Sequence, residues 1–280
     1  MKSNADPYTL ITGASNGLGK EIAYEFAKKG NNLILVSLPG ENLENYCREL
    51  ELKYKIRARF YESDLTKERS PAELTDWVKA NFSVNILVNN AGVGGSKLFE
   101  ESSVEYIDTI ILLNIRALAL ITRLMLSELK EHNPAYILNV ASMAAFSPIP
   151  YKTVYPASKA FVYSFSRSLH EELKKTSVKI SVISPGPIMT NSDTAYRIRK
   201  MGFYGRFGLL SANKVAQIAI NSMFNGKKVI IPGVLNKVSY FLLRIIPSRI
   251  RLYFLSRLIR KEIRKEVTDN SVMLQKSAGV

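Results

Sequence analysis

The stretch Tyr8-Thr9-Leu10-Ile11-Thr12-Gly13-Ala14-Ser15-Asn16-Gly17-Leu18-Gly19 decides the fold of this chain. A short apolar, β-branched run comes first, three glycines follow, and an amphipathic pattern runs from Lys20 to Lys29. Strand, glycine-rich turn and helix in this order form a phosphate-binding unit, because the glycines let backbone N–H groups approach a pyrophosphate and the helix N-terminus supplies positive potential. The spacing is G-x-x-x-G-x-G, and taken alone it is equally compatible with a plain tight turn.

Apolar runs alternate with helical patterns along the rest of the chain. Strands are predicted at 32–37, 56–63, 86–89, 135–141, 179–184 and 228–231, and helices at 41–53, 71–81, 104–130, 154–174 and 211–224. This alternation implies βαβ units, and therefore an α/β fold with a parallel sheet. Right-handed crossovers bring the C-terminal strand ends to one edge, where ligands of such sheets bind. Gly13, Ser37, Asp64 and Asn90 are predicted to meet at that edge.

The segment Tyr155-Pro156-Ala157-Ser158-Lys159 follows Ser142 by thirteen residues. If Pro156 starts a helix, Tyr155 and Lys159 lie four residues apart on one face. A cation within roughly 4 to 6 Å favours the phenolate and lowers the tyrosine pKa, which makes the phenol a usable acid or base. Taken alone, the pair also fits an ordinary amphipathic helix face.

The predicted helix from Val104 to Lys130 is apolar on most of its sides. Asp108, Arg116 and Arg123 argue against a membrane span, which needs about 20 largely uncharged residues. We expect this helix to pack against the sheet and against a second subunit.

Composition excludes several classes of protein. At 280 residues the chain suffices for one large core, and its 46% hydrophobic and 22% charged residues are ordinary for a globular protein. Cys47 is the only cysteine, so no disulfide forms within the chain. The N-terminal residues lack the apolar region of a secretory signal, and we expect a cytoplasmic protein. His132 and His170 have no partners at metal-ligand spacing, and no metal site is predicted.

The net charge of +15 is concentrated near the C-terminus. Residues 237–265 contain nine basic residues and one acidic residue, Glu262. This pattern suggests an attached basic element rather than a nucleic-acid-binding protein. The sequence therefore predicts a catalytic domain at 1–236, with a lid at about 188–210, and a basic amphipathic extension at 237–280.

Within the extension, an apolar run from Val238 to Ile246 is broken by Arg244 and stopped by Pro247. A helix with apolar residues at helical spacing is predicted from Ile250 to Ile263. Such a basic helix can lie in the interface of an anionic membrane, through residues 237–266. It can equally pack on the domain or on a second subunit, and both interpretations stay open.

Six motifs together resemble those of the short-chain dehydrogenase/reductase family in its single-domain form, over about residues 7–232. They are Gly13-x-x-x-Gly17-x-Gly19, Asn89-Asn90-Ala91-Gly92, Asn114, Ser142, Tyr155-x-x-x-Lys159 and Pro185-Gly186. The resemblance implies a Rossmann-type, doubly wound parallel sheet of seven strands with helices on both faces. It also implies a nicotinamide cofactor and a carbonyl/alcohol redox reaction.

The resemblance further implies catalytic roles for four residues. Tyr155 would be the acid that protonates the carbonyl oxygen, or the base in the reverse direction. Lys159 would lower its pKa and hold the nicotinamide ribose, and Ser142 would hydrogen-bond the same oxygen. Asn114 would pin a water that links Lys159 to solvent. Alternatively, Ser142 could cap a turn and Asn114 could satisfy a helix kink.

The same resemblance implies the cofactor contacts. These are Gly13, Ser15, Asn16, Gly17, Leu18, Gly19, Ser37, Asp64, Leu65, Asn90, Ala91, Gly92, Tyr155, Lys159, Pro185, Gly186, Ile188 and Thr190. An enzyme for NAD usually carries a carboxylate at the end of the second strand, where this chain has Ser37. We therefore favour NADP(H) over NAD(H), although no arginine grips a 2′-phosphate at Asn16 or Ser37.

Aromatic and apolar residues predict a lipophilic substrate such as a 3-oxoacyl group, a steroid-like ketone or an aldehyde. They are Phe146, Pro148, Ile149, Pro150, Met189, Tyr196, Phe203, Tyr204 and Phe207. Bases in the lid could meet an anionic acyl carrier or form a solvated face; they are Arg197, Arg199, Lys200 and Arg206. The family and the long apolar helix suggest a homodimer or homotetramer. The alternative function is a catalytically silent dinucleotide sensor or scaffold at a membrane surface.

Overall fold

The computed structural model describes residues 6–95, 97–189, 208–253 and 255–257. Seven parallel strands form one sheet in the order β3-β2-β1-β4-β5-β6-β9. From β1 to β3 the chain adds strands in one direction, and after β3 it crosses back to place β4 on the other side of β1. This is the strand order of a Rossmann-type doubly wound sheet, so the predicted fold class is confirmed. The strands are β1 (Tyr8–Thr12), β2 (Asn32–Ser37), β3 (Ala58–Glu62), β4 (Val84–Asn89), β5 (Ala135–Val140), β6 (Val178–Ile183) and β9 (Val229–Ile230).

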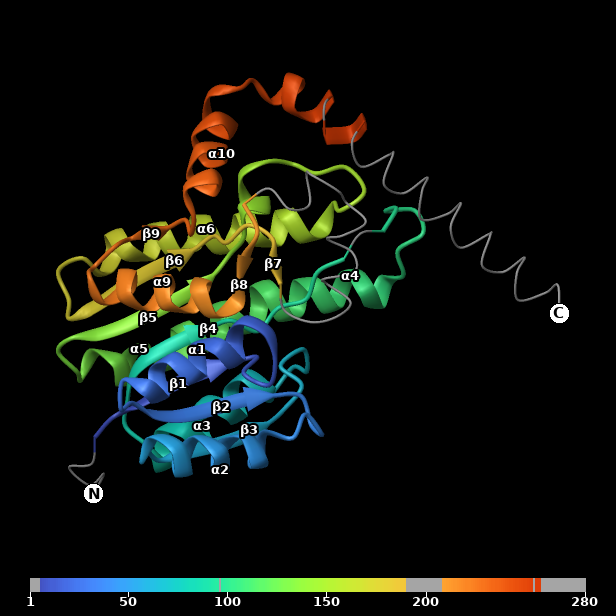
Figure 1. The fold of residues 1–280 in the computed structure, drawn as a ribbon. Coiled ribbons are helices and arrows are strands. Elements are labelled where there is room, and N and C mark those ends of the chain that lie inside the picture. Colours follow the sequence, from blue (N-terminus) through green and yellow to red (C-terminus); the bar gives the residue numbers. More distant parts are fainter. Residues whose placement is uncertain (1–5, 96, 190–207, 254, 258–280) are drawn as a thin grey trace, which may run out of the picture.

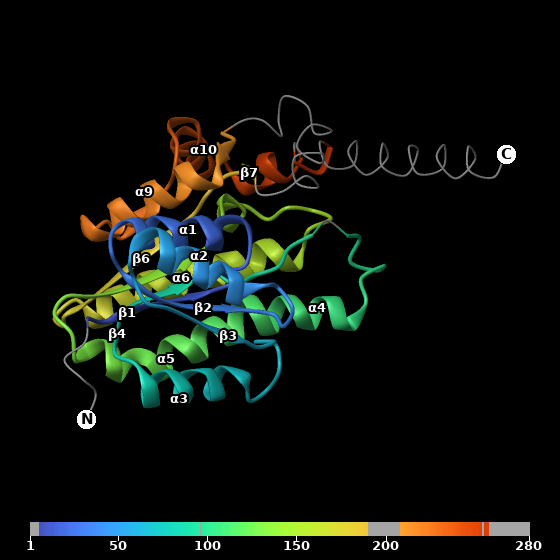
Figure 2. The ribbon, with the colours of Figure 1, turned by 60° about the horizontal axis from the view of Figure 1, so that its bottom comes forward.

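Helices cover both faces of the sheet (Figure 2). One core joins the sheet to α1 (Gly17–Lys28), α2 (Leu43–Tyr54) and α9 (Ala212–Phe224). The opposite core joins it to α3 (Ser70–Asn81) and α5 (Leu118–Lys130), with α6 (Val154–Leu173) beside them. Nearly every residue of the central strands is buried, as expected for a parallel sheet covered on both sides.

The glycine-rich stretch that opens the chain forms the link between β1 and α1. Gly13 and Gly17 have φ angles of +66° and +57°, which side chains rarely adopt. A Cβ on Gly19 would lie 2.0 Å from the carbonyl oxygen of Gly13, so only glycine lets the helix start this close to the strand. The helix begins at Gly17, three residues before the predicted start, because the turn itself supplies its first residues.

The long helix predicted from Val104 to Lys130 is not one regular α-helix. It consists of α4 (Val104–Ile111), a π-helical segment η1 (Leu112–Ala117) and α5. The prediction missed this wider turn, which contains the candidate residue Asn114, because π-helical turns have no sequence period of their own.

By length and composition, the run Val104–Lys130 could cross a membrane. One side of the run packs in the domain, where Ile110, Ile121 and Met125 are fully buried. The Arg116 guanidinium, in addition, donates to the Glu68 carbonyl oxygen at 2.6 Å. The expected contact of this helix with a second subunit stays a prediction.

After β6 the chain forms a short parallel pair, β7 (Ile188–Met189) and β8 (Leu210–Ser211). Most of the predicted lid, including Thr190, the lid aromatics and the lid bases, lies outside the described residues. Ser211 caps α9, its side chain accepting from the Lys214 N–H at 3.3 Å.

The C-terminal extension begins with α10 (Val234–Ile245), which ends before Pro247 as predicted. Residues 248–253 and 255–257 are again helical. Figure 1 shows α10 at the margin of the molecule, directed away from the sheet. The helix spans residue 236, so the boundary between the catalytic domain and the extension stays an expectation.

Candidate active site

A cavity of about 940 Å³ opens at the C-terminal edge of the sheet. Nearly all of the predicted cofactor and catalytic residues line it: Gly13, Ser15, Asn16, Gly17, Leu18, Gly19, Ser37, Asp64, Leu65, Asn90, Ala91, Gly92, Ser142, Tyr155, Lys159, Pro185, Gly186 and Ile188. Asn114 lies behind this lining, and Thr190 lies outside the described residues. The volume is at the upper end of the range for ligand sites, as a dinucleotide with a substrate requires.

The phosphate end of the cavity is the N-terminus of α1. Asn16 occupies the N-cap without bonding through its side chain, and the first turn contains no acidic residue. Its positive potential is therefore unopposed by any carboxylate in that turn. This end suits a pyrophosphate.

Asn90 fixes the glycine turn against the end of β4. Its side-chain amide donates to the Thr12 and Gly13 carbonyl oxygens at 3.0 and 2.9 Å. The Thr12 hydroxyl in turn accepts from the Asn90 and Ala91 N–H groups, each at 3.1 Å. Sequence reasoning named Asn90 but not Thr12, whose role depends on a partner almost eighty residues away.

Another part of the cavity lies beside the C-terminal ends of β2 and β3. Ser37, at the end of β2, donates to the Leu38 carbonyl oxygen at 2.9 Å and lines the cavity together with Glu41. Asp64 accepts from the Thr66 N–H at 3.0 Å and from its hydroxyl at 2.7 Å. Partial burial acts to raise the pKa of Asp64, but these bonds and the Lys67 ammonium outweigh it and hold the pKa below its usual value.

Tyr155, Ser142 and Lys159 meet on the opposite side of the cavity. The Lys159 ammonium lies 5.9 Å from the centre of the Tyr155 ring and donates to the Val140 carbonyl oxygen at 3.0 Å. Ser142 caps the short 3-10 helix η2 (Met143–Phe146), accepting from the Ala144 N–H at 3.1 Å, and also interacts with the phenol. The turn-capping interpretation of Ser142 is therefore confirmed, and its expected hydrogen bond to a substrate carbonyl oxygen stays a prediction.

The expected direction of the tyrosine shift was wrong. Burial raises the pKa of Tyr155, and the hydrogen bond with Ser142 only opposes this in part. Burial also lowers the pKa of Lys159 to about 8. The spacing argument assumed a cation directed at the phenol, but both groups are desolvated and the ammonium bonds Val140 instead.

Asn114 clamps the loop that follows β4. Its side chain accepts from the Val93 N–H at 2.9 Å and donates to the Val93 carbonyl oxygen, also at 2.9 Å. The same amide donates to the Ser158 hydroxyl at 2.9 Å. This buried residue therefore links the π-helical turn, the loop and α6, which carries Tyr155.

Two residues that sequence reasoning missed complete the site. A Cβ on Gly94 would lie 2.7 Å from the Tyr155 ring, so this glycine packs on the phenol. Asn236, buried in α10, donates to the Gly208 and Pro232 carbonyl oxygens at 2.9 and 2.8 Å and fills the space beside Gly186. The three glycines at positions 92, 94 and 95 were a sequence signal that could have indicated Gly94, whereas no sequence signal indicated Asn236.

A second, apolar cavity of about 380 Å³ adjoins the first, and both contain Ala144 in their walls. Phe146, Pro148, Ile149 and Pro150 line it, as predicted for a lipophilic pocket, and Leu252 of the extension closes it. Met189, expected in the same pocket, is half exposed and lines neither cavity.

The histidines and the cysteine lie apart from the catalytic groups. His132 contacts the Ser83 hydroxyl at 3.0 Å, and His170 contacts the Ile180 carbonyl oxygen at 3.2 Å. Cys47 is buried in the core, which raises the pKa of its thiol to about 12. In the part of the chain that the structure describes, no group of His, Cys, Asp and Glu is arranged to hold a metal.

Comparison with known proteins places this geometry in a family. The family model described as "short chain dehydrogenase" matches residues 7–200. Human 17-beta-hydroxysteroid dehydrogenase type 3 is 34% identical over 65% of this chain and 59% of its own length. Bovine very-long-chain 3-oxoacyl-CoA reductase is 32% identical over 65% of this chain and 60% of its own length.

A solved structure shares the fold. The short-chain dehydrogenase from Sphingobium yanoikuyae in complex with NADPH has a TM-score of 0.72 and 25% identity, covering 86% of this chain and 95% of its own. The aligned region thus spans about three fifths of each of the two curated relatives, whereas the solved structure is matched almost completely. This chain belongs to the short-chain dehydrogenase family, as its motifs predicted.

Proposed function

We propose that this chain is an NADP(H)-dependent enzyme that reduces a carbonyl to an alcohol, or performs the reverse reaction, on a lipophilic substrate. The observation that carries the proposal is the meeting of Tyr155, Ser142 and Lys159 in the same cavity as the glycine turn. A proton donor, an oxygen-binding hydroxyl and a buried cation are the groups that a hydride-accepting carbonyl needs.

The residues present fit a dinucleotide. A Cβ on Gly19 would lie 2.0 Å from the Gly13 carbonyl oxygen, so glycine here lets the N-terminus of α1 lie directly at the end of β1, where a pyrophosphate would bind. Lys159 would hold the nicotinamide ribose, and Asn90 to Gly92 would lie under the adenosine. When bound, the reduced nicotinamide supplies the hydride that the carbonyl carbon accepts.

The protein side chains would supply and later recover the proton that the carbonyl oxygen needs. Tyr155 donates its phenolic proton to the carbonyl oxygen as negative charge develops there, and Ser142 donates a hydrogen bond to the same oxygen. The positive charge of Lys159 stabilises the phenolate that remains until a proton returns. In the oxidative direction the phenolate of Tyr155 accepts the proton of the alcohol.

The preference for NADP(H) rests on the end of β2. Ser37 occupies the position where a carboxylate would bind the 2′-OH of NAD and repel a 2′-phosphate. Glu41 also lines this end of the cavity and is the residue that weighs against the preference. Separate fluorescence titrations with NADPH and NADH decide between the two cofactors.

The adjoining apolar cavity supports a lipophilic substrate, with the reacting carbonyl at Ser142 and the apolar part beyond Ala144. A 3-oxoacyl group, a steroid-like ketone and an aldehyde all have this form. The names of the two curated relatives, one a hydroxysteroid dehydrogenase and one a 3-oxoacyl-CoA reductase, agree with the first two. A homodimer or homotetramer in the cytoplasm, in contact with a membrane, completes the proposal.

The test is NADPH oxidation with a panel of lipophilic ketones, aldehydes and 3-oxoacyl thioesters. Turnover that falls by roughly a thousandfold or more in Tyr155→Phe, with NADPH binding retained, supports the proposal. Absence of binding by either dinucleotide contradicts it. A Tyr155→Phe protein that keeps its cellular role would instead support a silent dinucleotide sensor, the alternative function.

A further inference from the structure

Helix α10 faces the protein with its polar side. Asn236 is buried and anchors the helix to the Gly208 and Pro232 carbonyl oxygens. One turn later, the Tyr240 ring packs against Phe146 with their centres 4.6 Å apart. The side chains of Asn236 and Tyr240 therefore attach the helix to the domain.

The opposite side of α10 is apolar and faces outward. Val234, Val238, Phe241 and Ile245 recur at helical spacing, with Leu235 and Leu242 beside them, and all six are between 47% and 74% exposed. A surface helix normally turns such a stripe toward the core. In α10 the arrangement is inverted, so the stripe is a candidate binding surface.

The helical segment that follows Pro247 also has one side that contacts the domain and one side that is exposed. Leu252 closes the apolar cavity, and the Arg251 guanidinium donates to the Phe146 carbonyl oxygen at 2.7 Å. Ile250 and Tyr253 are about half exposed. The segment is thus fixed to the domain on one side and presents apolar side chains on the other.

Positive charge surrounds this surface. Lys237, Arg244, Arg249 and Arg257 are exposed on the two helical segments. In the sequence, residues 194–261 contain fourteen Lys or Arg and no Asp or Glu. Exposed apolar side chains among bases are the combination that binds an interface with negative headgroups.

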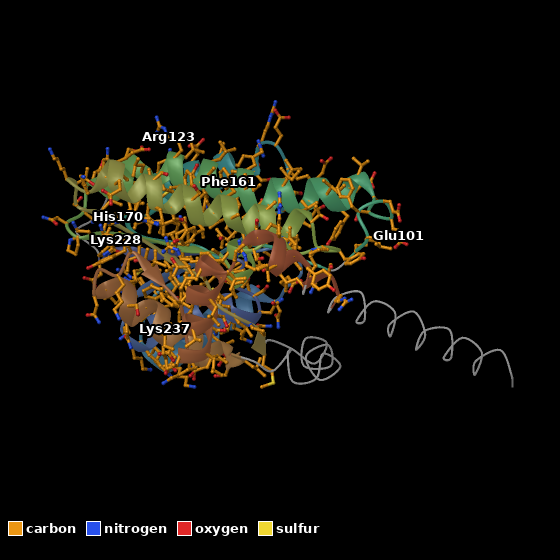
Figure 3. All side chains as sticks on the ribbon, turned by 90° about the horizontal axis from the view of Figure 1, so that it is seen from above. Glu101, Arg123, Phe161, His170, Lys228 and Lys237 are labelled. Atoms are coloured by element: carbon orange, nitrogen blue, oxygen red, sulfur yellow. The ribbon has the colours of Figure 1, made fainter. Side chains whose placement is uncertain are left out.

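A second copy of the chain fits this surface poorly. A two-fold contact would bring the same acid-free patch against itself, and like charges would oppose each other. Figure 3 shows Arg123, on the helix expected to meet another subunit, on the other side of the molecule from Lys237. The charge pattern therefore favours a lipid surface over self-association.

We propose that the outward faces of α10 and of residues 248–253 and 255–257 dock the protein on an anionic phospholipid membrane. Phe241, Ile245 and their neighbours enter the headgroup region, and the bases contact lipid phosphates. This proposal does not rest on the catalytic one, since docking requires neither cofactor nor turnover.

The apolar side chains are tested by sedimenting the full chain with phosphatidylcholine vesicles that contain phosphatidylserine. Phe241 and Ile245 are 62% and 61% exposed, so the double variant F241S/I245S should fold. We expect its vesicle partition coefficient to fall roughly tenfold or more. The matched control L52S/F99S removes two side chains that are 68% and 59% exposed elsewhere, and should bind like the native chain.

The charges are tested in the same assay with K237Q/R249Q. We expect a loss of roughly 25-fold on phosphatidylserine vesicles, because each of the two bases near an anionic surface strengthens binding about fivefold. K130Q/K175Q removes the same charge from exposed positions elsewhere and should have a far smaller effect. Binding should also weaken as salt increases.

Three results would overturn the proposal. The native chain could fail to sediment with anionic vesicles, or F241S/I245S could bind as well as the control. Light scattering could also show that F241S/I245S lowers the mass of the particle in solution, which would make the surface a subunit interface. Tyr155→Phe should bind vesicles normally, so loss of catalysis and loss of docking are separately visible.

Discussion

Asn114 holds both backbone groups of Val93, accepting from its N–H and donating to its carbonyl oxygen, each at 2.9 Å. The residue belongs to a π-helical turn, and its third bond goes to Ser158, one turn from Tyr155. The wider turn places a buried amide between the β4 loop and α6. One side chain thereby sets the distance between the loop and the helix that carries Tyr155.

Replacement of Asn114 by Ala should impair both folding and catalysis. Several buried polar groups lose their partners, so the free energy of unfolding should fall by about 3 kcal/mol. The folded enzyme should also lose turnover by roughly tenfold or more, because the loop moves relative to Tyr155. Thermal unfolding and kcat, measured well below the transition, separate the two effects.

Asn139 provides the matched control for Asn114. It is also a buried asparagine, in the interior strand β5, bonded to Asn89 at 2.8 Å and to Ser166 at 2.9 Å, and it lines neither cavity. Asn139→Ala should destabilise the protein by a similar amount with kcat nearly unchanged. Equal kcat in the two variants would mean that Asn114 has a structural role alone.

Gly94 should not tolerate a methyl group. A Cβ there would lie 2.7 and 2.8 Å from two carbons of the Tyr155 ring, so the ring or the loop has to move. Gly94→Ala should therefore reduce turnover by at least about tenfold while the melting temperature changes little. Phe99→Ser, an exposed change in the same loop, should leave both quantities near their native values.

The sequence sufficed for the features that local patterns encode. Strand and helix periods predicted the parallel sheet, and the spacings around Gly13, Ser142 and Tyr155 predicted which side chains would line one cavity. Parallel strands end at a common edge, so residues that follow different strands converge without further information. This is why Ser37, Asp64 and Asn90, far apart in the chain, were placed correctly.

Features that depend on packing between distant segments were not predictable in this way. Three such features are the π-helical turn at Asn114, the contact of Gly94 with the Tyr155 ring and the position of Asn236 beside Gly186. Each depends on a neighbour from another element. The prediction of a lowered pKa for Tyr155 was wrong for the same reason, since spacing predicts proximity to Lys159 but not the desolvation of both groups.

Ser37→Asp should change the cofactor preference. A carboxylate at the end of β2 would accept a hydrogen bond from a ribose 2′-OH and repel a 2′-phosphate. The ratio of the dissociation constants for NADPH and NADH should shift toward NADH by roughly tenfold or more. Asn42→Asp adds the same charge to the following loop, where Asn42 is exposed, and should have little effect. An unchanged ratio in Ser37→Asp would place the 2′ position elsewhere.

The buried ammonium of Lys159 should make the stability of the cofactor-free protein depend on pH. Its folded pKa of about 8 lies below the usual 10.5, so the unfolded chain binds more protons between these two values. Stability therefore rises with pH across this window, by about 3 kcal/mol in total for this group. Lys159→Met removes the titrating group. From pH 7 to 10.5 the free energy of unfolding of the native chain should therefore rise by about 3 kcal/mol relative to that of the variant. Denaturant unfolding at several pH values measures it, and a constant difference would mean that Lys159 titrates alike in both states.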